Sequence, residues 1–193
     1  MTPPQKLKRT QERHYSAHHM LIETAQRSNE RVIRQEPGWS YDALATMMFS
    51  ALAVEALANA FGERKVDNWS DYESSTPNAK LQLVAVSLHI KYDRQIEPWA
   101  TARWLIKFRN LVAHAKPQLI RDEVVLTQNE LDKRLFDRPE SKIEREVTVE
   151  NAARALSAAS AIKELFCNSI PPKEAMGLLT DGWSGFTALH QED

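Results

Sequence analysis

An arginine and a histidine in the stretch Arg109-Asn110-Leu111-Val112-Ala113-His114 are the residues of this chain best suited to do chemistry. The guanidinium of arginine keeps its charge at every physiological pH and matches the geometry of phosphate oxygens. The imidazole of histidine gains and loses a proton near neutral pH. Together the two groups suit acid–base chemistry at a phosphodiester bond.

The element that must position these groups is a helix, predicted from about Pro98 to the motif, which ends just before Pro117. At 100° per residue its core-facing side should hold Trp104, Phe108, Leu111, Val112 and Ala115. A second, polar stripe carries Arg103, Lys107, Asn110 and His114. Arg109 projects from the other flank of the non-core side. Between Arg109 and the polar stripe lies a narrow strip of mostly small residues, Ala102, Ile106 and Ala113.

The spacing of Arg109 and His114 predicts a site shared by two chains. Within one helix these two residues do not share a face. Small residues let two helices approach closely, so two copies of this helix could cross at the small-residue strip. Arg109 of one subunit could then approach His114 of the other. The pattern therefore predicts a two-fold symmetric homodimer.

The motif resembles that of the HEPN domain family, which combines an arginine, an adjacent polar residue and a histidine after four intervening positions. The resemblance covers about residues 5–168, and the apolar segment with Glu55 and Asn59 also resembles the second helix of related bundles. It implies an all-α fold, an antiparallel bundle of four to five helices that dimerises. It also implies a metal-independent endoribonuclease without a cofactor, of the kind found in toxin–antitoxin, antiviral or RNA-processing systems.

The resemblance gives each motif residue a role. His114 would act as general acid or base on an RNA 2′-hydroxyl or on the leaving 5′-oxygen. Arg109 would stabilise charge on the phosphoryl oxygens, and Asn110 would orient the imidazole or the phosphate. The products would be a 2′,3′-cyclic phosphate and a 5′-hydroxyl. Basic residues that could hold RNA phosphates are Arg103, Lys107 and Lys116, and near the N-terminus Lys6, Lys8, Arg9 and Arg13.

Two other interpretations stay open. Many toxin members of the family carry a tyrosine one or two positions after the histidine, where this chain has Ala115 and Lys116. The chain could therefore be a catalytically inactive HEPN-like module that binds RNA, a nucleotide or a protein partner such as an antitoxin. In the third interpretation the bundle is purely structural: His114 only caps a helix C-terminus and Arg109 pairs with an acidic neighbour.

The apolar run 43–62 is about as long as a membrane span. Polar residues interrupt it, so we interpret it as the central helix of a soluble bundle with no membrane contact. Glu55 is its only ionised residue and needs a partner, for which Arg109 is one candidate. A structural ion pair is favoured over a catalytic role for Glu55. Asn59, one turn further along the same face, shares that interpretation.

Three histidines near the N-terminus offer weaker signals. His14 and His18 would lie one turn apart on the first predicted helix, with His19 adjacent, which is acceptable geometry for two metal ligands. No cysteine or carboxylate pattern completes the site nearby, so we expect a solvated helix face and no metal. We interpret Trp99 and Trp104 as core or interface residues rather than as platforms for stacked bases.

Length and composition fit one soluble domain. The chain has 193 residues, of which 42% are hydrophobic and 26% charged, enough for a single well-buried core. Five glycines and frequent alanines favour helix over sheet. Cys167 is the single cysteine, which excludes an internal disulfide and favours a reducing compartment. The polar, basic residues 1–9 argue against a secretory signal, so we expect a cytoplasmic protein.

The net charge of −1 hides an uneven distribution. Residues 1–34 carry seven Lys or Arg against three acidic residues, and residues 77–116 carry seven against two. Residues 35–76, between them, carry two against seven. The two basic segments could form a phosphate-facing surface. Alternatively, the acidic segment pairs with them inside the bundle.

Breakers and capping residues predict the order of elements. The expected helices cover residues 5–35, 40–61, 77–91, 98–114 and 149–168, with a short one near 129–136. Residues 118–126, after the motif helix, could form a small β-hairpin or an extended loop. Residues 1–170 should form a single HEPN-like helical domain. Residues 171–193 should form a C-terminal tail whose Trp183 and Phe186 dock elsewhere on the protein.

Overall fold

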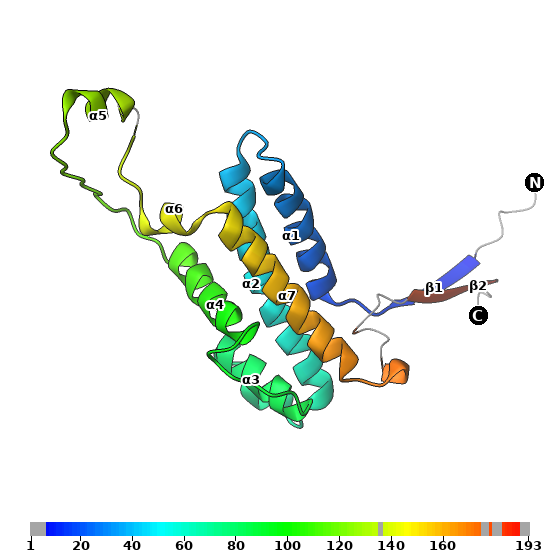
Figure 1. Cartoon of the computed structure of the whole chain (residues 1–193). Helices are drawn as coiled ribbons and strands as arrows, with labels where there is room; N and C mark the ends of the chain where they lie inside the picture. Colours follow the sequence, from blue (N-terminus) through cyan, green and yellow to red (C-terminus); the bar gives the residue numbers. More distant parts are fainter. Residues whose placement is uncertain (1–6, 135–136, 175–177, 179–182, 190–193) are drawn as a thin grey trace, which may run out of the picture.

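The computed structural model describes residues 7–134, 137–174, 178 and 183–189, and it is mostly helical with one two-stranded antiparallel sheet (Figure 1). The longer helices are α1 (Ala17–Ile33), α2 (Trp39–Lys65), α3 (Pro77–Ser87), α4 (Trp99–Ala113) and α7 (Val149–Asn168). The shorter ones are η1 (Trp69–Tyr72), α5 (Gln128–Lys133), α6 (Lys142–Glu146) and η2 (Pro172–Glu174). The strands are β1 (Leu7–Arg13) and β2 (Trp183–Leu189).

Helix α2 is the centre of the fold and packs against α1, α3, α4 and α7 (Figure 1). It begins after Gly38, whose φ of 86° is a left-handed conformation that glycine adopts without strain. Within the described residues, α2 alone is long and apolar enough to cross a membrane. That is weak evidence, because half of its most apolar window is already buried by the other helices.

The core consists of two clusters of buried side chains along α2. One surrounds Phe61 and contains Leu57, Leu81, Trp99, Ile162 and Phe166. The other lies nearer the start of α2 and contains Val32, Met47, Leu105, Phe108 and Ala155. Each cluster takes side chains from α2, α4 and α7, so α4 is fixed along its length against the two neighbours that position its last turn.

Capping residues in the sequence correctly predicted where several helices begin. The hydroxyl of Thr148 accepts a hydrogen bond from the backbone N–H of Asn151 at 3.1 Å, and α7 covers the predicted residues 149–168. Thr76 caps α3 in the same way, with the N–H of Ala79 at 3.3 Å. Helix α3 ends at Ser87, earlier than expected, because His89 adopts a left-handed φ of 57°.

The predicted start of the first helix is wrong. Residues 7–13 form strand β1 and not helix, and α1 begins only at Ala17, after Ser16. The sequence of β1 offers a helix no apolar face to bury, whereas its backbone pairs along its whole length with β2. His14 therefore precedes α1, and the expected His14–His18 ligand geometry on one helix does not form.

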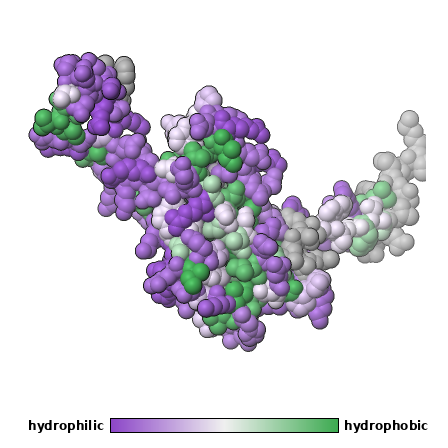
Figure 2. All heavy atoms as spheres, viewed as in Figure 1, coloured by the Kyte–Doolittle hydropathy of each residue, from purple (hydrophilic) through white to green (hydrophobic). Residues whose placement is uncertain are grey.

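Of the two alternatives predicted for residues 118–126, the extended loop is observed and the small β-hairpin is not. Residues 118–126 have no regular structure, and the sheet pairs the two ends of the chain instead, from Leu7 opposite Leu189 to Arg13 opposite Trp183. Residues 115–134 and 137–140, with the expected short helix α5, form an arm that extends from the helices (Figure 1). The last two residues of that predicted helix, 135–136, lie outside the described residues. Figure 2 shows hydrophobic side chains on this arm, where Leu119, Val124, Val125 and Leu131 are exposed.

Helix α6 was not expected, although its sequence carries a capping signal. Ser141 accepts a hydrogen bond from the N–H of Glu144, and the carboxylate of Glu144 accepts one from the N–H of Ser141. Hydrogen bonds that the backbone N–H and the hydroxyl of Ser141 donate to the carboxylate hold the pKa of Glu144 below its ordinary value. The predicted tail 171–193 contributes β2 and the buried Leu178, which packs in the α2 core cluster around Phe61.

The expected core face of α4 is rotated from the observed one. Ala102, Leu105 and Ile106 are buried, whereas Trp104 and Leu111 are half-buried and Ala115 is exposed. The helix carries apolar residues around most of its circumference, and contacts with both α2 and α7 decide which of them are covered. As a consequence, Ala102 and Ile106 of the small-residue strip are not free to meet a second copy.

Candidate functional site

The last turn of α4 holds the motif at an open end of the helix. The helix ends at Ala113, and the backbone N–H of His114 donates a hydrogen bond to the carbonyl of Asn110 at 3.0 Å. His114 is thus the C-cap residue, with its side chain exposed. Asn110 is exposed as well. Both side chains are accessible to a ligand.

Arg109 faces α2 rather than the outer flank of α4. Its Nη2 donates to Oε2 of Glu55 at 2.6 Å, and the two side chains are 23% and 26% exposed. The ion pair expected from the isolated charge of Glu55 is therefore confirmed. The Nε of Arg109 is buried and has no hydrogen-bond partner in the described chain. The guanidinium is held in place by one carboxylate and keeps a donor unused.

One chain does not assemble Arg109 and His114 into a single site. In the part of the chain that the structure describes, no hydrogen bond joins these two side chains. At 100° per residue, they point about 140° apart around the axis of α4. The arrangement separates a clamped guanidinium on the α2 side of the helix from an exposed imidazole on the solvent side.

The basic residues expected to hold RNA lie on the solvent side with His114. Lys107 and Lys116 are exposed, and Arg103 is half-buried and donates to the backbone carbonyl of Arg94 at 3.2 Å. Elsewhere, some acidic residues of segment 35–76 pair with the two basic segments, although the pairs at Arg31, which is 55% exposed, lie on the surface and not inside the bundle. Besides the pair of Glu55 with Arg109, Asp42 and Glu36 lie 3.2 and 3.4 Å from Nε of Arg31.

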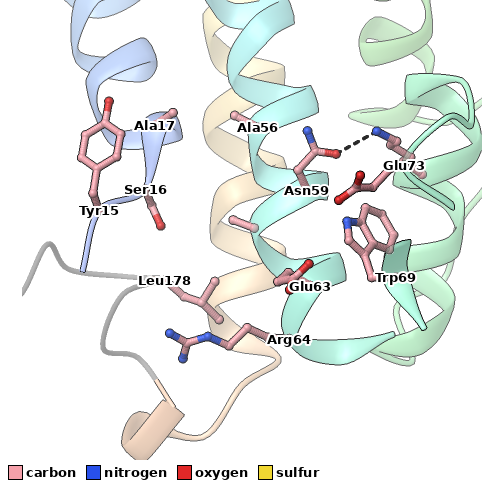
Figure 3. Close-up of a pocket in the computed structure, with 12 residues that line it drawn as sticks. Tyr15, Ser16, Ala17, Ala56, Asn59, Glu63, Arg64, Trp69, Glu73 and Leu178 are labelled. Atoms are coloured by element: carbon pink, nitrogen blue, oxygen red, sulfur yellow. Dashed lines mark hydrogen bonds between the residues drawn. The ribbon is translucent and has the colours of Figure 1, made fainter. Parts of the chain in front are cut away.

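Asn59 belongs to a different place, the pocket shown in Figure 3. Its Oδ1 accepts a hydrogen bond from Nζ of Lys80 at 3.1 Å, and this ammonium also lies 5.9 Å from the ring centre of Trp69. The pocket has a volume of about 710 Å³ and is lined by the ends of α2 and α3, by η1 and by the segment around Tyr15. Asn59 therefore does not share the surroundings of Glu55.

Lys80 was missed by the sequence reasoning, although a signal exists. It is the one charged residue of α3 and is 6% exposed, so its ammonium requires a buried acceptor, which Asn59 supplies. The imidazole of His18 is buried and stacks on His19 with ring centres 4.1 Å apart. Among the described residues no group of three His, Cys, Asp or Glu could hold a metal ion.

Gly62 is required for the wall of this pocket. A Cβ at this position would lie 2.4 Å from the indole ring of Trp69, so any side chain displaces the tryptophan. We expect Gly62→Ala to lower the free energy of unfolding by about 1–3 kcal/mol. Thermal unfolding measures this loss. The same change should cost less in a Trp69→Leu background, where the smaller side chain leaves room. An equal cost in both backgrounds would contradict the explanation.

The contribution of the Glu55–Arg109 pair can be measured directly. Glu55→Ala leaves a half-buried guanidinium without its carboxylate, and we expect unfolding free energy to fall by about 1–2 kcal/mol, between the values for exposed and buried pairs. In urea unfolding, the double variant with Arg109→Ala should show a coupling energy of about 1 kcal/mol. Glu63→Ala, an exposed glutamate on α2, is the control. A coupling energy near zero would show that the pair does not stabilise the fold.

Comparison of the chain with protein-family models, with curated proteins and with solved structures finds no match in any of the three.

Proposed function

We propose that this chain is a HEPN-like, metal-independent endoribonuclease that acts as a homodimer in the cytoplasm, with Arg109, Asn110 and His114 as its catalytic residues. The observation that carries the proposal is the state of Arg109. Its guanidinium is fixed by Glu55 at 2.6 Å and keeps an unused buried donor, and it lies five residues before the exposed imidazole at the end of the same helix. Such a pre-positioned cation suits the stabilisation of charge on a phosphate.

The proposed reaction needs one proton acceptor, one proton donor and one cation. An imidazole of His114 takes the proton of the RNA 2′-hydroxyl, and the 2′-oxygen forms a bond to phosphorus. The bond from phosphorus to the 5′-oxygen breaks, and that oxygen takes a proton from the protonated imidazole of His114 and leaves as a 5′-hydroxyl. Arg109 donates hydrogen bonds to the non-bridging oxygens, where negative charge increases. The products are a 2′,3′-cyclic phosphate and a 5′-hydroxyl.

A second copy of the chain is needed to bring the two groups together, and α2 offers the surface for it. Tyr41, Ala45, Met48, Leu52 and Ala56 follow one another at spacings of three or four residues, which places them on one face of the helix. We call these five residues the α2 stripe. Tyr41 is 80% exposed and the other four are only half-buried. The α2 stripe is thus an apolar face that the chain itself leaves partly uncovered.

The position of the α2 stripe links the dimer to the site. Around the helix axis, Glu55 lies within about 60° of Met48 and Leu52, so it borders the stripe. A copy seated there would also reach the Glu55–Arg109 pair and the flank of α4 that carries Ala113 and Asn110. This contact replaces the crossing at Ala102 and Ile106, which are buried within one chain. Each site would then lie between subunits.

A binding module without catalysis is the second candidate. The Glu55–Arg109 ion pair favours this candidate. Glu55 already neutralises the positive charge of Arg109, so an RNA phosphate would have to share the guanidinium with that carboxylate. In this case the protein binds RNA, a nucleotide or an antitoxin-like partner and cleaves nothing. The exposed hydrophobic residues of the arm after α4, Leu119 and Val125 among them, would suit a protein partner.

Incubation of the purified protein with total RNA in EDTA tests the proposal. Wild-type protein should cleave the RNA without a metal. Arg109→Ala should reduce the rate of cleavage by about 10²–10³-fold. Arg27→Ala, which removes an arginine that is 76% exposed on α1 and outside the proposed site, is the control and should leave the rate nearly unchanged. Cleavage that survives Arg109→Ala would contradict the proposed role. RNA binding without cleavage would favour the second candidate.

A further inference from the structure

The β1–β2 ribbon extends from the helices and exposes nearly all of its side chains (Figure 1). The two strands pair over seven residues each, which gives a ribbon about 23 Å long. An isolated pair of strands is marginally stable in water, because it buries little apolar surface. We therefore expect that this exposed ribbon serves as a surface for contact with another molecule.

The two faces of the ribbon have different residues. Residues directly opposite each other in an antiparallel pair lie on the same face. The register therefore places Arg9 opposite Thr187 and Arg13 opposite Trp183 on one face, which we call the arginine face. The other face carries Lys8, Thr10 and Glu12 with Ser184, Phe186 and Ala188.

The arginine face and its base bring cations and aromatic rings together. Trp183 is 66% exposed beside Arg13, and the guanidinium of Arg13 in turn lies 5.2 Å from the ring centre of Tyr15, which is 54% exposed. Arg9 forms no ion pair within the described part of the chain. Two arginines, an exposed indole and an exposed phenol thus follow one another along the ribbon and its base.

Gly185 lies in the middle of the arginine face, opposite Gln11. It lies between Trp183 and Thr187 in the sequence, and a Cβ there would be 2.9 Å from the carbonyl oxygen of Thr10. The glycine is thus required for the close pairing of the strands. On this face the side chain of Gln11 lies beside the glycine, with its Cγ 3.1 Å from where a Cβ would be.

We propose that the arginine face binds single-stranded RNA, with a base stacked on Trp183 and phosphates held by Arg9 and Arg13. Unpaired bases stack on exposed aromatic rings, and arginines next to those rings hold the backbone, whatever the base sequence. The choice of RNA rests on the proposed function. The inference adds a substrate-holding surface that is separate from Arg109 and His114 and that lies on strands predicted to be helix and tail.

Binding is measured on the full chain carrying His114→Ala, so that cleavage does not interfere. The probe is a fluorescein-labelled single-stranded oligouridylate of about 15 nucleotides, followed by fluorescence anisotropy at several salt concentrations. We expect Trp183→Ala to weaken binding about 5-fold or more. Arg9→Ala should weaken binding and reduce the slope of log affinity against log salt by about 0.7.

The opposite face supplies matched controls. Phe186, at 65% exposed, is as accessible as Trp183 and lies on the same strand, so Phe186→Ala should change affinity less than about 2-fold. Lys8→Ala removes one charge from the neighbouring position and should have a smaller effect than Arg9→Ala. Equal effects of the two aromatic substitutions, or no effect of Trp183→Ala, would overturn the inference.

Two further outcomes separate this inference from the proposed function. If wild-type protein cleaves RNA in EDTA while Trp183→Ala binds RNA normally, the function stands and the ribbon inference fails. If wild-type protein does not cleave RNA but Trp183→Ala and Arg9→Ala lose binding, the ribbon inference stands and the nuclease proposal fails. Conversion of the dimer to a monomer by Trp183→Ala, with unchanged RNA affinity of each chain, would make the ribbon a protein contact and overturn its role in RNA binding.

Discussion

Replacing His114 by alanine is expected to reduce metal-free RNA cleavage by about 10²–10⁴-fold, the range that one general acid or base contributes. The substitution should leave folding intact, because the imidazole is exposed at the end of α4. Cleavage of labelled RNA in EDTA measures the rate, and thermal unfolding checks the fold. If expression of the wild-type protein arrests growth, as a toxin would, His114→Ala should relieve the arrest.

A second exposed histidine provides the control for this prediction. His89 lies two residues after the end of α3 and has a left-handed φ of 57°, a conformation that asparagine tolerates. His89→Asn should therefore keep both the fold and the rate of cleavage. Wild-type activity in His114→Ala would place the chemistry elsewhere in the chain. If both His114→Ala and His89→Asn lose activity, the loss would be explained by damage to the fold and not by a catalytic role of His114.

Replacing Leu52 by glutamate is expected to convert the proposed dimer to a monomer and to abolish the proposed cleavage with it. Leu52 lies in the middle of the α2 stripe and is only half-buried, so the charge can reach solvent in a single folded chain. In a dimer the two carboxylates would be buried against an apolar surface, which costs several kcal/mol. Light scattering at micromolar concentration reports the mass.

Val86 offers the matched control for Leu52. It is 58% exposed on α3, outside the α2 stripe, so Val86→Glu should leave both the mass and the rate of cleavage unchanged. A Leu52→Glu protein that remains a dimer would show that the copies meet on another surface. A monomeric Leu52→Glu protein that still cleaves RNA would show that one chain holds a complete site.

The elements that the sequence predicted well are those with local signals. Thr76 and Thr148 stand directly before apolar runs and mark the starts of α3 and α7, because a threonine hydroxyl there satisfies a free backbone N–H. The ion pair of Glu55 was also predictable, since a single charge in a long apolar run must find an opposite charge. In both cases the physical requirement is contained within a short segment.

The features that the sequence did not predict depend on contacts between distant segments. Strand β1 forms because β2, at the other end of the chain, pairs with it, and the sequence of β1 alone does not contain that information. The orientation of α4 depends on which of its apolar sides α2 and α7 cover. Asn59 is a neutral amide with many suitable partners, and only the fold brings Lys80 to it.

The catalytic assignment depends on six residues at the end of one helix. The mostly helical fold and the fixed position of Arg109 support it. Both observations are equally compatible with cleavage and with binding, because both activities use the guanidinium of Arg109. The two interpretations differ in one respect that can be tested: catalysis requires Arg109 and His114 from different chains at one phosphate.

Mixing two inactive variants tests this requirement most directly. Arg109→Ala retains His114, and His114→Ala retains Arg109, so a mixed dimer contains one site with both groups and one with neither. After exchange of subunits, we expect the mixture to recover about a quarter of the wild-type rate of RNA cleavage in EDTA, since about half of the dimers are mixed. If the mixture stays as inactive as either variant alone, while mixed dimers are shown to form, Arg109 and His114 do not act across the subunit boundary and the account is wrong.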